Sequence, residues 1–312
     1  MPELACSTAD RDAWLAARRS GVTGTDIVTI MGLSHTDSPY SLYWRKLGQV
    51  PETPDNPRFA LGRYLEPYVH QLWIDTEPDV ASKFYTTSTL FRSSARPWQM
   101  ATPDALPTDC SAVAEFKTWA DADKPSWSDG PPAAVRAQTI WYMDVMDVPT
   151  GHVGVVFLPS GEFRSYVIEH QDGCPTNRIE TAVDCLTCID MALMRKAGLA
   201  FQQRLFDNDP PDPDASAATL AAVKARFTKR AGKRGAVDID LWERWTKAKA
   251  SLEHWTQGAR GYESLIREQL GEADEIEVDG QLVGRRIVTT AHVKAYTRTQ
   301  DYIKRTKGAG DE

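Results

Sequence analysis

The sequence predicts an α/β layer fold followed by a C-terminal extension, and three features of the 312-residue chain indicate it. Helical and strand patterns alternate over the first two-thirds of the chain, as in domains whose helices flank a sheet. A stretch rich in proline and aspartate at 207–217 then interrupts both patterns. Beyond it, the sequence favours one long helix and a hairpin. We therefore expect a domain at 1–206, a linker at 207–217 and a helical and β-hairpin region at 218–312.

Four helices are predicted in the first domain from the residues that begin and end them. Ser38 suits the N-cap position, Pro39 suits the first helical position, and Gly48 suits the end of that helix. An Asn-Pro pair and a Gly-Pro-Pro run introduce two later helices. The predicted helices span about 38–48, 56–76, 130–146 and 176–197.

Runs that are apolar, or that alternate between apolar and polar residues, predict the strands of the sheet. These runs fall at about 80–91, 97–102, 111–118, 151–159 and 162–168. In the extension, apolar residues recur at near-helical spacing from Asp240 to Leu270. A hairpin then follows, with Asp279 and Gly280 as its two-residue turn.

The composition is that of an ordinary globular protein, with 42% apolar and 25% charged residues. No apolar stretch approaches the roughly 18 residues that cross a bilayer, and the N-terminus has no secretory signal pattern. We therefore expect a cytoplasmic protein with no membrane partner. The five cysteines are odd in number and unevenly spaced, which argues against an extracellular disulfide framework.

The net charge of −7 disfavours a nucleic-acid partner for the chain as a whole, but the charge is unevenly distributed. Residues 220–312 carry 18 basic and 14 acidic side chains, and six basic residues lie between Lys224 and Arg234. A local surface of an acidic protein can still be basic. This basic run predicts a solvated helical face first and a phosphate-binding patch as the alternative.

Three ionisable residues on neighbouring predicted strands share one chemical theme. Asp104 closes one strand, and Glu115 and Lys117 lie on the next. Alternate residues of a strand face the same side, so Glu115 and Lys117 project together while Phe116 points into the core. A short loop between the strands brings Asp104 beside them. Two carboxylates and one ammonium are therefore expected to converge.

Such a cluster is suited to hold a divalent cation. Adjacent carboxylates repel each other unless a cation relieves them, and Mg²⁺ prefers oxygen ligands while it keeps waters and phosphate oxygens. Lys117 would then hold or polarise an attacking water and offset the charge on a phosphate. The cluster therefore predicts phosphodiester hydrolysis.

The same segments resemble the PD-(D/E)xK nuclease motif, here Pro103-Asp104 followed by Glu115-Phe116-Lys117. Residues 62–66, which read GRYLE in the helix before the sheet, resemble the G-x-x-x-E element of these nucleases. The resemblance implies a restriction-endonuclease-like core, with a mixed sheet flanked by helices.

Two further segments are similar to the YqaJ-type viral recombinase nucleases, relatives of phage lambda exonuclease. Residues 19–34 (RSGVTGTDIVTIMGLS) resemble that family's R-x-G-I-G-G-S-D-I-x-x-I-L-G-x-S opening. Gln138 and Tyr142, one helical turn apart, resemble its Q-x-x-x-Y element. Ala105 and Phe116 depart from the family, which usually has Gly after Pro-Asp and Ile or Leu between Glu and Lys.

The resemblance implies a role for each matching position. An arginine fork with hydroxyl donors would anchor a terminal 5′ phosphate and position the adjacent bond, which favours exonuclease over endonuclease action. The implied metal ligands are Asp104, Glu115, Glu66 and the backbone carbonyl of Phe116. The implied catalytic residues are these three carboxylates together with Gln138 and with Lys117, which activates water. The implied phosphate or DNA contacts are Arg19, Thr25, Thr102 and Tyr142.

The family implies a magnesium-dependent exonuclease of phage recombination, with Mn²⁺ as a substitute for Mg²⁺. Such an enzyme degrades double-stranded DNA ends in the 5′→3′ direction and leaves a 3′ single strand. A single-strand annealing protein and a ring-shaped homo-oligomer are implied as well. The alternatives are another PD-(D/E)xK endonuclease of repair or defence, and a non-catalytic DNA-binding or assembly protein. The region at 218–312 is left with three candidate roles: subunit contacts, DNA binding and partner docking.

Cys185 and Cys188 are predicted on one face of a helix among apolar residues, where buried thiols pack as small hydrophobes. Their spacing fits the iron–sulfur nucleases of this superfamily poorly, so core packing is the expected role and an iron–sulfur cluster or zinc is the alternative. The six histidines form no H-x-x-x-H pair, which disfavours a zinc hydrolase, and no phosphate-binding P-loop motif is present.

Overall fold

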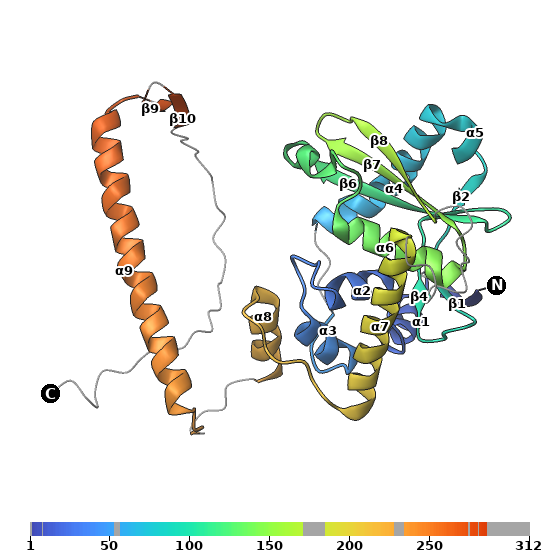
Figure 1. Cartoon of the computed structure of the whole chain (residues 1–312), viewed down its shortest axis with the longest axis horizontal. Coiled ribbons are helices and arrows are strands. Elements are labelled where there is room, and N and C mark those ends of the chain that lie inside the picture. The colour runs from blue at the N-terminus through green and yellow to red at the C-terminus, as the bar shows by residue number, and fades with distance from the viewer. Residues whose placement is uncertain are drawn as a thin grey trace. The chain divides into compact units, whose positions relative to one another are not determined.

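The computed structural model describes residues 2–7, 9–52, 57–170, 185–227, 234–273, 275–279 and 281–285. It divides the chain into two compact units, residues 1–228 and 229–312, and each is described here by itself (Figure 1). Among the described helices, none is both long enough and apolar enough to cross a membrane.

The first unit is built on a five-stranded mixed sheet in the order β2-β5-β6-β7-β8. Only β6 and β7 pair in parallel, because helix α6 connects them, and the other neighbours are antiparallel. The mixed α/β class predicted from the sequence is therefore confirmed. The strands are β2 (Phe84–Thr86), β5 (Ala105–Pro107), β6 (Ala112–Ala120), β7 (Thr150–Leu158) and β8 (Phe163–Glu169).

A second, three-stranded sheet has the order β1-β3-β4 and is antiparallel throughout. It consists of β1 (Glu3–Ser7), β3 (Thr89–Arg92) and β4 (Met100–Ala101). The sequence pattern did not predict β1, because this edge strand has no buried residue and depends on pairing with β3 far along the chain. The run predicted as one strand at 80–91 is divided among a short helix, β2 and β3.

The helix after Ser38 begins where its capping residue predicts, and Thr23 caps a helix that the sequence did not predict. Ser38 and Thr23 each accept from the backbone three residues ahead in a capping box. The helices predicted at 38–48, 56–76 and 130–146 are confirmed within a few residues. The bounds are α1 (Arg11–Arg19), α2 (Gly24–Ile30), α3 (Pro39–Lys46), α4 (Pro57–Thr76), α5 (Pro78–Ala81), a 3₁₀ helix (Asp121–Trp127), α6 (Ala133–Met146), α7 (Leu186–Asp207) and α8 (Ala217–Arg226).

Helix α7 ends ten residues beyond the position predicted for it, because Gly198 and Phe201 continue its buried face. A Cβ atom at position 198 would lie 2.8 Å from the Trp98 ring, so glycine lets this helix approach the tryptophan. The beginning of the predicted helix, at 176–184, lies outside the described residues.

The two faces of the main sheet are covered by different helices (Figure 1). Helix α4 packs on the face that carries Ala114 and Phe116 of β6. Helix α6 packs on the other face, against Val113 and Val153, and it is buried over most of its length by α2 and α7. Burial of such apolar faces provides the main free energy of folding. The sheet is thus held between two separate apolar clusters.

The domain boundary lies later than the predicted linker at 207–217, since the first compact unit extends to residue 228. Residues 208–216 contain no helix or strand, as their prolines predicted. Helix α8, however, packs on α3. Thr219 Oγ1 lies 2.7 Å from Ser38 Oγ, and the Arg226 guanidinium lies 3.1 Å from the centre of the Trp44 ring. These contacts join residues 217–227 to the first unit.

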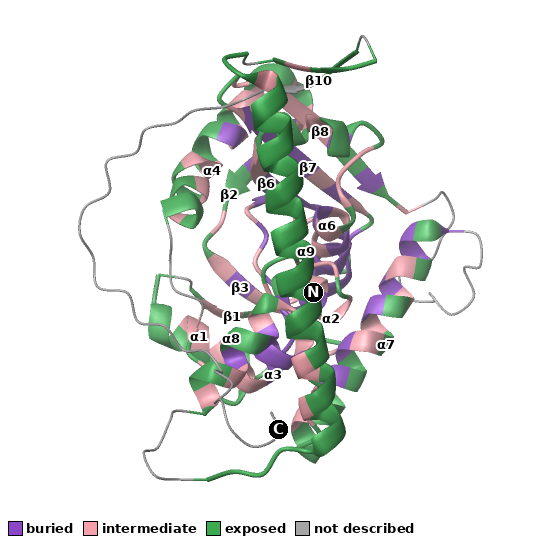
Figure 2. Cartoon of the chain, turned by 90° about the vertical axis from the view of Figure 1, so that its left-hand side faces the viewer, coloured by how far each residue is buried: buried purple, intermediate pink, exposed green. Residues whose placement is uncertain are grey.

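The second unit contains helix α9 (Ile239–Leu270) and a hairpin of β9 (Glu275–Val278) and β10 (Gln281–Arg285). The predicted hairpin is confirmed, and its turn residue Asp279 has a φ of +49°. No residue of α9 is buried, and Figure 2 shows this helix as exposed over most of its length.

Candidate active site

Strand β6 presents its residues to two different environments, as its alternation predicted. Phe116 faces α4, where its ring centre lies 5.4 Å from that of His70. Glu115 and Lys117 face the opposite side, toward α6. The side chain of Glu115 is buried, with 3% of the residue exposed, whereas Lys117 is partly exposed. A buried carboxylate on the central strand needs a specific reason, since burial without partners is costly.

Asp104 reaches this strand from the turn between β4 and β5. Its backbone N–H donates to Ala114 O at 3.0 Å, and its carbonyl accepts from Thr87 at 2.9 Å. These bonds fix the turn, and the Phe116 N–H donates to Asp104 Oδ2 at 2.7 Å. The two carboxyl groups are close enough for the charge of Glu115 to raise the pKa of Asp104. The structure therefore brings Asp104 to Glu115 as expected, but the strand that pairs with β6 is β5, which follows Asp104, and the strand predicted at 97–102 lies in the other sheet.

Lys117 and Gln138 bind one oxygen of Glu115. Lys117 Nζ donates to Glu115 Oε1 in a close ion pair, and Gln138 Nε2 donates to the same oxygen at 2.8 Å. Lys117 also donates to Gln138 Oε1 at 3.2 Å. The second amide hydrogen of Gln138 reaches Tyr142 Oη at 2.9 Å. Gln138 and Tyr142 of α6 thus form one network with the β6 pair.

Glu66 approaches the cluster from α4. It is half-buried, and its charge interacts with those of Glu115 and Lys117. Gly62, one turn earlier, lies near β6, and a Cβ at this position would meet only Thr118 Oγ1 at 3.8 Å. That distance is an ordinary contact, so this glycine is not required by close packing.

Burial and like charges raise the pKa of three carboxyl groups in this cluster. Burial is the largest cause for each of them. The pKa of Asp104 lies well above its ordinary value, because burial is reinforced by the charges of Glu115 and Glu66. The pKa of Glu66 is raised by burial and by Glu115. Burial also raises the pKa of Glu115, although Lys117 opposes the shift. The carboxyl groups therefore lack sufficient positive charge nearby.

Lys117 remains an ammonium in this environment. Burial alone would lower its pKa, but Glu115 and Asp104 outweigh that effect and raise it. The phenol of Tyr142 is likewise kept neutral, because burial and the charges of Glu115 and Asp104 raise its pKa well above the ordinary value. At neutral pH the two groups can therefore donate hydrogen bonds but cannot accept a proton as bases.

The residues present fit a divalent cation. Glu115 Oε2 is buried and has no hydrogen-bond partner among the described residues. Asp104 and Glu66 lie beside it with raised pKa values, so all three offer hard oxygen ligands that lack compensating charge. Phe116 donates its N–H toward Asp104, and the N–H and C=O of one strand residue point to the same side. The Phe116 carbonyl therefore faces this group as well.

A second cluster of polar side chains lies at the turn between α1 and α2. Arg18 donates to Thr25 Oγ1 at 2.9 Å and to Thr23 Oγ1 at 3.3 Å. Arg19, the position matched to the family, instead contacts Glu52 Oε1 at 3.3 Å and is largely exposed. The structure therefore brings Arg18, which the motif comparison missed, to Thr25, and it does not bring Arg19 there.

Lys46 and Asp26 hold this turn in place. Lys46 Nζ donates to the carbonyls of Arg18 and Gly21 and to Asp26 Oδ2, each at 2.6 Å. Burial alone would raise the pKa of Asp26, but Lys46 and Arg18 outweigh it and lower that pKa. The sequence missed Lys46 because this lysine meets the turn only through the packing of α3.

Gly24 connects the turn to the carboxylate cluster. A Cβ atom here would lie 2.4 Å from Tyr142 Cε1 and 3.0 Å from Gln138 Cγ. Only glycine therefore lets the beginning of α2 pack against these two residues of α6. Thr102, the remaining predicted contact, is half-buried directly after β4. Most of the basic run 224–234 lies outside the described residues, and its Arg226 packs on Trp44.

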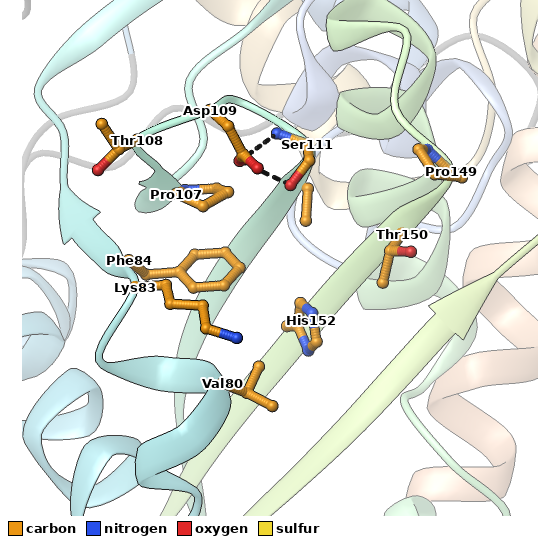
Figure 3. Close-up of a pocket in the computed structure, with 11 residues that line it drawn as sticks. Val80, Lys83, Phe84, Pro107, Thr108, Asp109, Ser111, Pro149, Thr150 and His152 are labelled. Atoms are coloured by element: carbon orange, nitrogen blue, oxygen red, sulfur yellow. Dashed lines mark hydrogen bonds between the residues drawn. The ribbon is translucent and has the colours of Figure 1, made fainter.

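A separate pocket lies at the beginning of β6 and β7, on the α4 face of the sheet (Figure 3). Phe84, Pro107 and His152 form much of its wall, and Asp109 beside it accepts hydrogen bonds from Ser111. No predicted catalytic or phosphate-binding residue lines this pocket. It is distinct from the cluster around Glu115, which faces α6.

A mixed sheet whose central strand carries Glu115 and Lys117, with Asp104 at its edge and helices on both faces, defines a domain of the PD-(D/E)xK class. Residues 13–152 match the model of the YqaJ-like viral recombinase domain. The resemblance drawn from the motifs is therefore confirmed over these residues.

One relative and several solved structures are similar to this chain. The Bacillus subtilis (strain 168) protein described as uncharacterized protein YqaJ is 24% identical over 277 residues, which cover 86% of this chain and 81% of that protein. An alkaline exonuclease from Laribacter hongkongensis is 17% identical, with a TM-score of 0.47 over 64% of this chain and 94% of its own. A phage-related exonuclease from Haemophilus somnus 129PT is 12% identical, with a TM-score of 0.42 over 60% and 96%.

Proposed function

We propose that this protein is a divalent-metal-dependent exonuclease of the phage type, which hydrolyses DNA from double-stranded ends. Magnesium is the expected ion, with manganese as a substitute. The YqaJ-like domain supports the phage-type assignment, and the chemistry of the cluster supports phosphodiester hydrolysis. The single observation that carries the proposal is the buried oxygen Glu115 Oε2, which has no hydrogen-bond partner in the described part of the chain and lies beside Asp104 and Lys117.

The proposed metal ligands are Asp104, Glu115, Glu66 and the Phe116 carbonyl. When bound there, a divalent cation supplies Lewis-acid stabilisation of charge on the phosphate. Gln138 fixes the Glu115 side chain, because it donates to Oε1 and so leaves Oε2 as the oxygen available for a ligand. It also orients Lys117 by accepting a hydrogen bond from it.

Lys117 is assigned to the attacking water and to the negative charge that develops on the phosphate. Its raised pKa keeps the ammonium protonated, so it orients water as a hydrogen-bond donor and does not act as the base. Tyr142, which is also protonated, donates from the neighbouring turn of α6. Both groups are held before substrate arrives, and such preorganisation lowers the cost of reaching the transition state.

The turn at 18–25 is proposed to bind the 5′-terminal phosphate. A guanidinium with two threonine hydroxyls offers charge-assisted donors, and a terminal phosphate carries more charge than an internal one. Arg18 is the direct candidate, with Thr23 and Thr25. Arg19 is a candidate for the adjacent DNA backbone. The close approach of Gly24 to Tyr142 places this turn next to the carboxylate cluster. The proposed 5′→3′ direction and 3′ single-stranded product rest on the resemblance to the family.

A single-strand annealing protein is proposed as the partner that uses this 3′ strand, and a homo-oligomer, in the form of a ring, as the assembly that retains DNA. Both proposals rest on the family, and the cytoplasm of the host cell is the expected location. Thr102 is proposed as a contact near the scissile phosphate, on the basis of its place directly after β4.

The test compares Lys117→Ala with the wild-type chain on linear duplex DNA in magnesium buffer. Loss of the ammonium should lower the rate by at least about 100-fold, the size typical for removal of one charge-stabilising donor. Folding and DNA binding should be retained. Lys124→Ala is the matched control, since Lys124 forms surface ion pairs with Asp121 and Glu162 and should cut DNA normally.

A second comparison separates exonuclease from endonuclease action. Covalently closed circular DNA should resist the wild-type protein, while linear duplex with a 5′ phosphate should be degraded faster than the same duplex without it. Cleavage of the circle at a similar rate would favour the endonuclease alternative. Absence of any cleavage by folded, DNA-binding protein would favour a non-catalytic binding role.

A further inference from the structure

Three ligating side chains meet at the end of β8, away from the carboxylate cluster. They are His170, directly after the strand, and Cys185 and Cys188 at the beginning of α7. Their ligand atoms all lie within 4.8 Å of one another, and His170 Nδ1 is 3.1 Å from Cys188 Sγ. Both cysteines are buried and are thiols. This set is larger than the cysteine pair that the sequence singled out.

The backbone holds these three residues in place before any ligand binds. The His170 N–H donates to Pro149 O at 3.1 Å, which fixes the residue beside the beginning of β7. Thr187, between the two cysteines, donates from Oγ1 to Glu169 O at 2.9 Å. This bond connects the first turn of α7 to the residue before His170. Both sides of the cluster are therefore anchored by hydrogen bonds that do not involve its ligand atoms.

The chemistry of this set suits zinc. An imidazole and two thiolates are ligands that Zn²⁺ prefers, and a Cys-x-x-Cys spacing places two sulfurs on one ion. In tetrahedral coordination, with Zn–S of about 2.3 Å and Zn–N of about 2.0–2.1 Å, the ligand atoms lie about 3.5–3.8 Å apart. In the structure His170 Nδ1 and Cys188 Sγ are 3.1 Å apart, and all ligand atoms lie within 4.8 Å of one another, so these distances lie on either side of the expected values. Side-chain adjustments of about 1 Å would close the site.

Apolar packing accounts for the cysteines but not for the histidine. A buried thiol behaves as a small hydrophobe, and Cys185 and Cys188 do belong to the main apolar cluster. His170, however, directs one ring nitrogen at a sulfur, while its Nε2 is buried with no hydrogen-bond partner among the described residues. A buried polar atom without a partner costs about 1–3 kcal/mol. Packing alone gives no reason to place an imidazole here.

We propose that His170, Cys185 and Cys188 bind one Zn²⁺ ion, which joins the end of β8 to the beginning of α7. Among the described residues three ligands meet here, and the fourth tetrahedral position is left to water or to another group. The role is structural, since α7 packs through Met191, Met194 and Phe201 on the apolar cluster that supports α6. The soft sulfur ligands also keep this ion distinct from the hard cation proposed at Glu115.

The test measures metal in the full-length protein after purification without added metal or chelator. Elemental analysis should find about one zinc per chain in the wild type, and Cys188→Ser should lose it. Cys6→Ser is the matched control, because Cys6 lies on β1, and it should keep its zinc. Equal zinc content in wild type and Cys188→Ser, the absence of zinc, or iron in its place would overturn the proposal.

Cobalt provides a readout that does not depend on how well the cysteine variant folds. Co²⁺ added to metal-stripped wild-type protein should give the near-ultraviolet charge-transfer absorption of a thiolate complex. His170→Ala, which leaves both sulfurs, should weaken binding at least about ten-fold, as expected for loss of one ligand or its support. Magnesium should not displace the cobalt. A cobalt spectrum without thiolate absorption would refute the site.

Discussion

Two buried acids in this protein, Asp144 and Glu115, are compensated to very different extents. Asp144 accepts from Arg96 and Arg195 at one oxygen and from Gln99 and Arg195 at the other, so both oxygens are bound. Glu115 Oε1 accepts hydrogen bonds from Lys117 and Gln138, while Oε2 has no hydrogen-bond partner among the described residues. Both side chains are buried. The difference separates a carboxylate that stabilises the fold from one that is available for chemistry.

The two acids also differ in what surrounds them. Two guanidinium groups face Asp144, whereas other carboxyl groups face Glu115 from Asp104 and Glu66. A buried charge without sufficient counter-charge costs folding free energy, and a protein keeps it where a ligand will supply that charge. Substitutions at the two sites should therefore have opposite effects on activity and on stability.

The largest effect is expected from Glu115→Gln. This variant keeps the shape of the side chain but removes one negative charge, so metal-dependent DNA hydrolysis should fall by at least about 100-fold, given that bound metal contributes several kcal/mol. The melting temperature should stay the same or rise, because repulsion from Asp104 and Glu66 is relieved. Hydrolysis rates check the predicted loss of activity, and calorimetry on the same preparation checks the predicted melting temperature. A large loss of melting temperature would remove the contrast with Asp144.

The second effect is expected from Asp144→Ala, which leaves Arg96 and Arg195 facing each other without their carboxylate. Removal of one partner from a buried ion pair costs about 3–5 kcal/mol, and we expect the lower end because both arginines are partly exposed. Denaturant unfolding measures the loss. Asp190→Ala is the control, since Asp190 pairs with Arg136 at the surface and should cost at most about 1 kcal/mol.

Two glycine substitutions test how the phosphate-binding turn is coupled to the cluster. Gly24→Ala would place a Cβ against Tyr142 and Gln138, so it should cost about 1–3 kcal/mol and also slow hydrolysis by displacing Gln138. Gly62→Ala meets only Thr118 at 3.8 Å inside α4 and should be neutral or stabilising by up to about 1 kcal/mol. Equal losses in both variants would contradict the coupling through Gly24.

The smallest effect concerns His152 in the pocket of Figure 3. Burial lowers its pKa in the folded chain, although Glu77 and Glu169 oppose the shift. Below the ordinary histidine pKa of about 6.5, the unfolded chain therefore binds a proton that the folded chain does not. The contribution of His152 to stability should therefore fall as the pH drops from 7 to 5. His152→Phe should reduce that slope, and His70, whose pKa burial also lowers, should account for some of the remainder.

The meeting of Asp104, Glu115 and Lys117 could be predicted because it depends on local rules. Strand alternation places the last two on one side of β6, and a turn between antiparallel neighbours brings in the first. The helix that begins after Ser38 follows from an equally local signal, its capping residue.

Tertiary packing decided what the sequence did not predict. Successive helix residues differ by about 100° around the axis, so a motif match cannot decide whether Arg18 or Arg19 faces Thr25. Lys46 reaches the same turn only through the docking of α3. His170 could not be joined to Cys185 from spacing alone, because their proximity depends on where β8 ends relative to α7.

The packing of α8 on α3 determines where the chain can be truncated. Arg226 covers the Trp44 ring, and buried Thr219 and Ala222 complete the same contact. A chain cut within the proline-rich stretch would lose this cover and expose an aromatic surface to water, inviting aggregation. A chain ended just after residue 228 would keep it. The shortest soluble fragment is therefore expected to include the helix that follows the prolines.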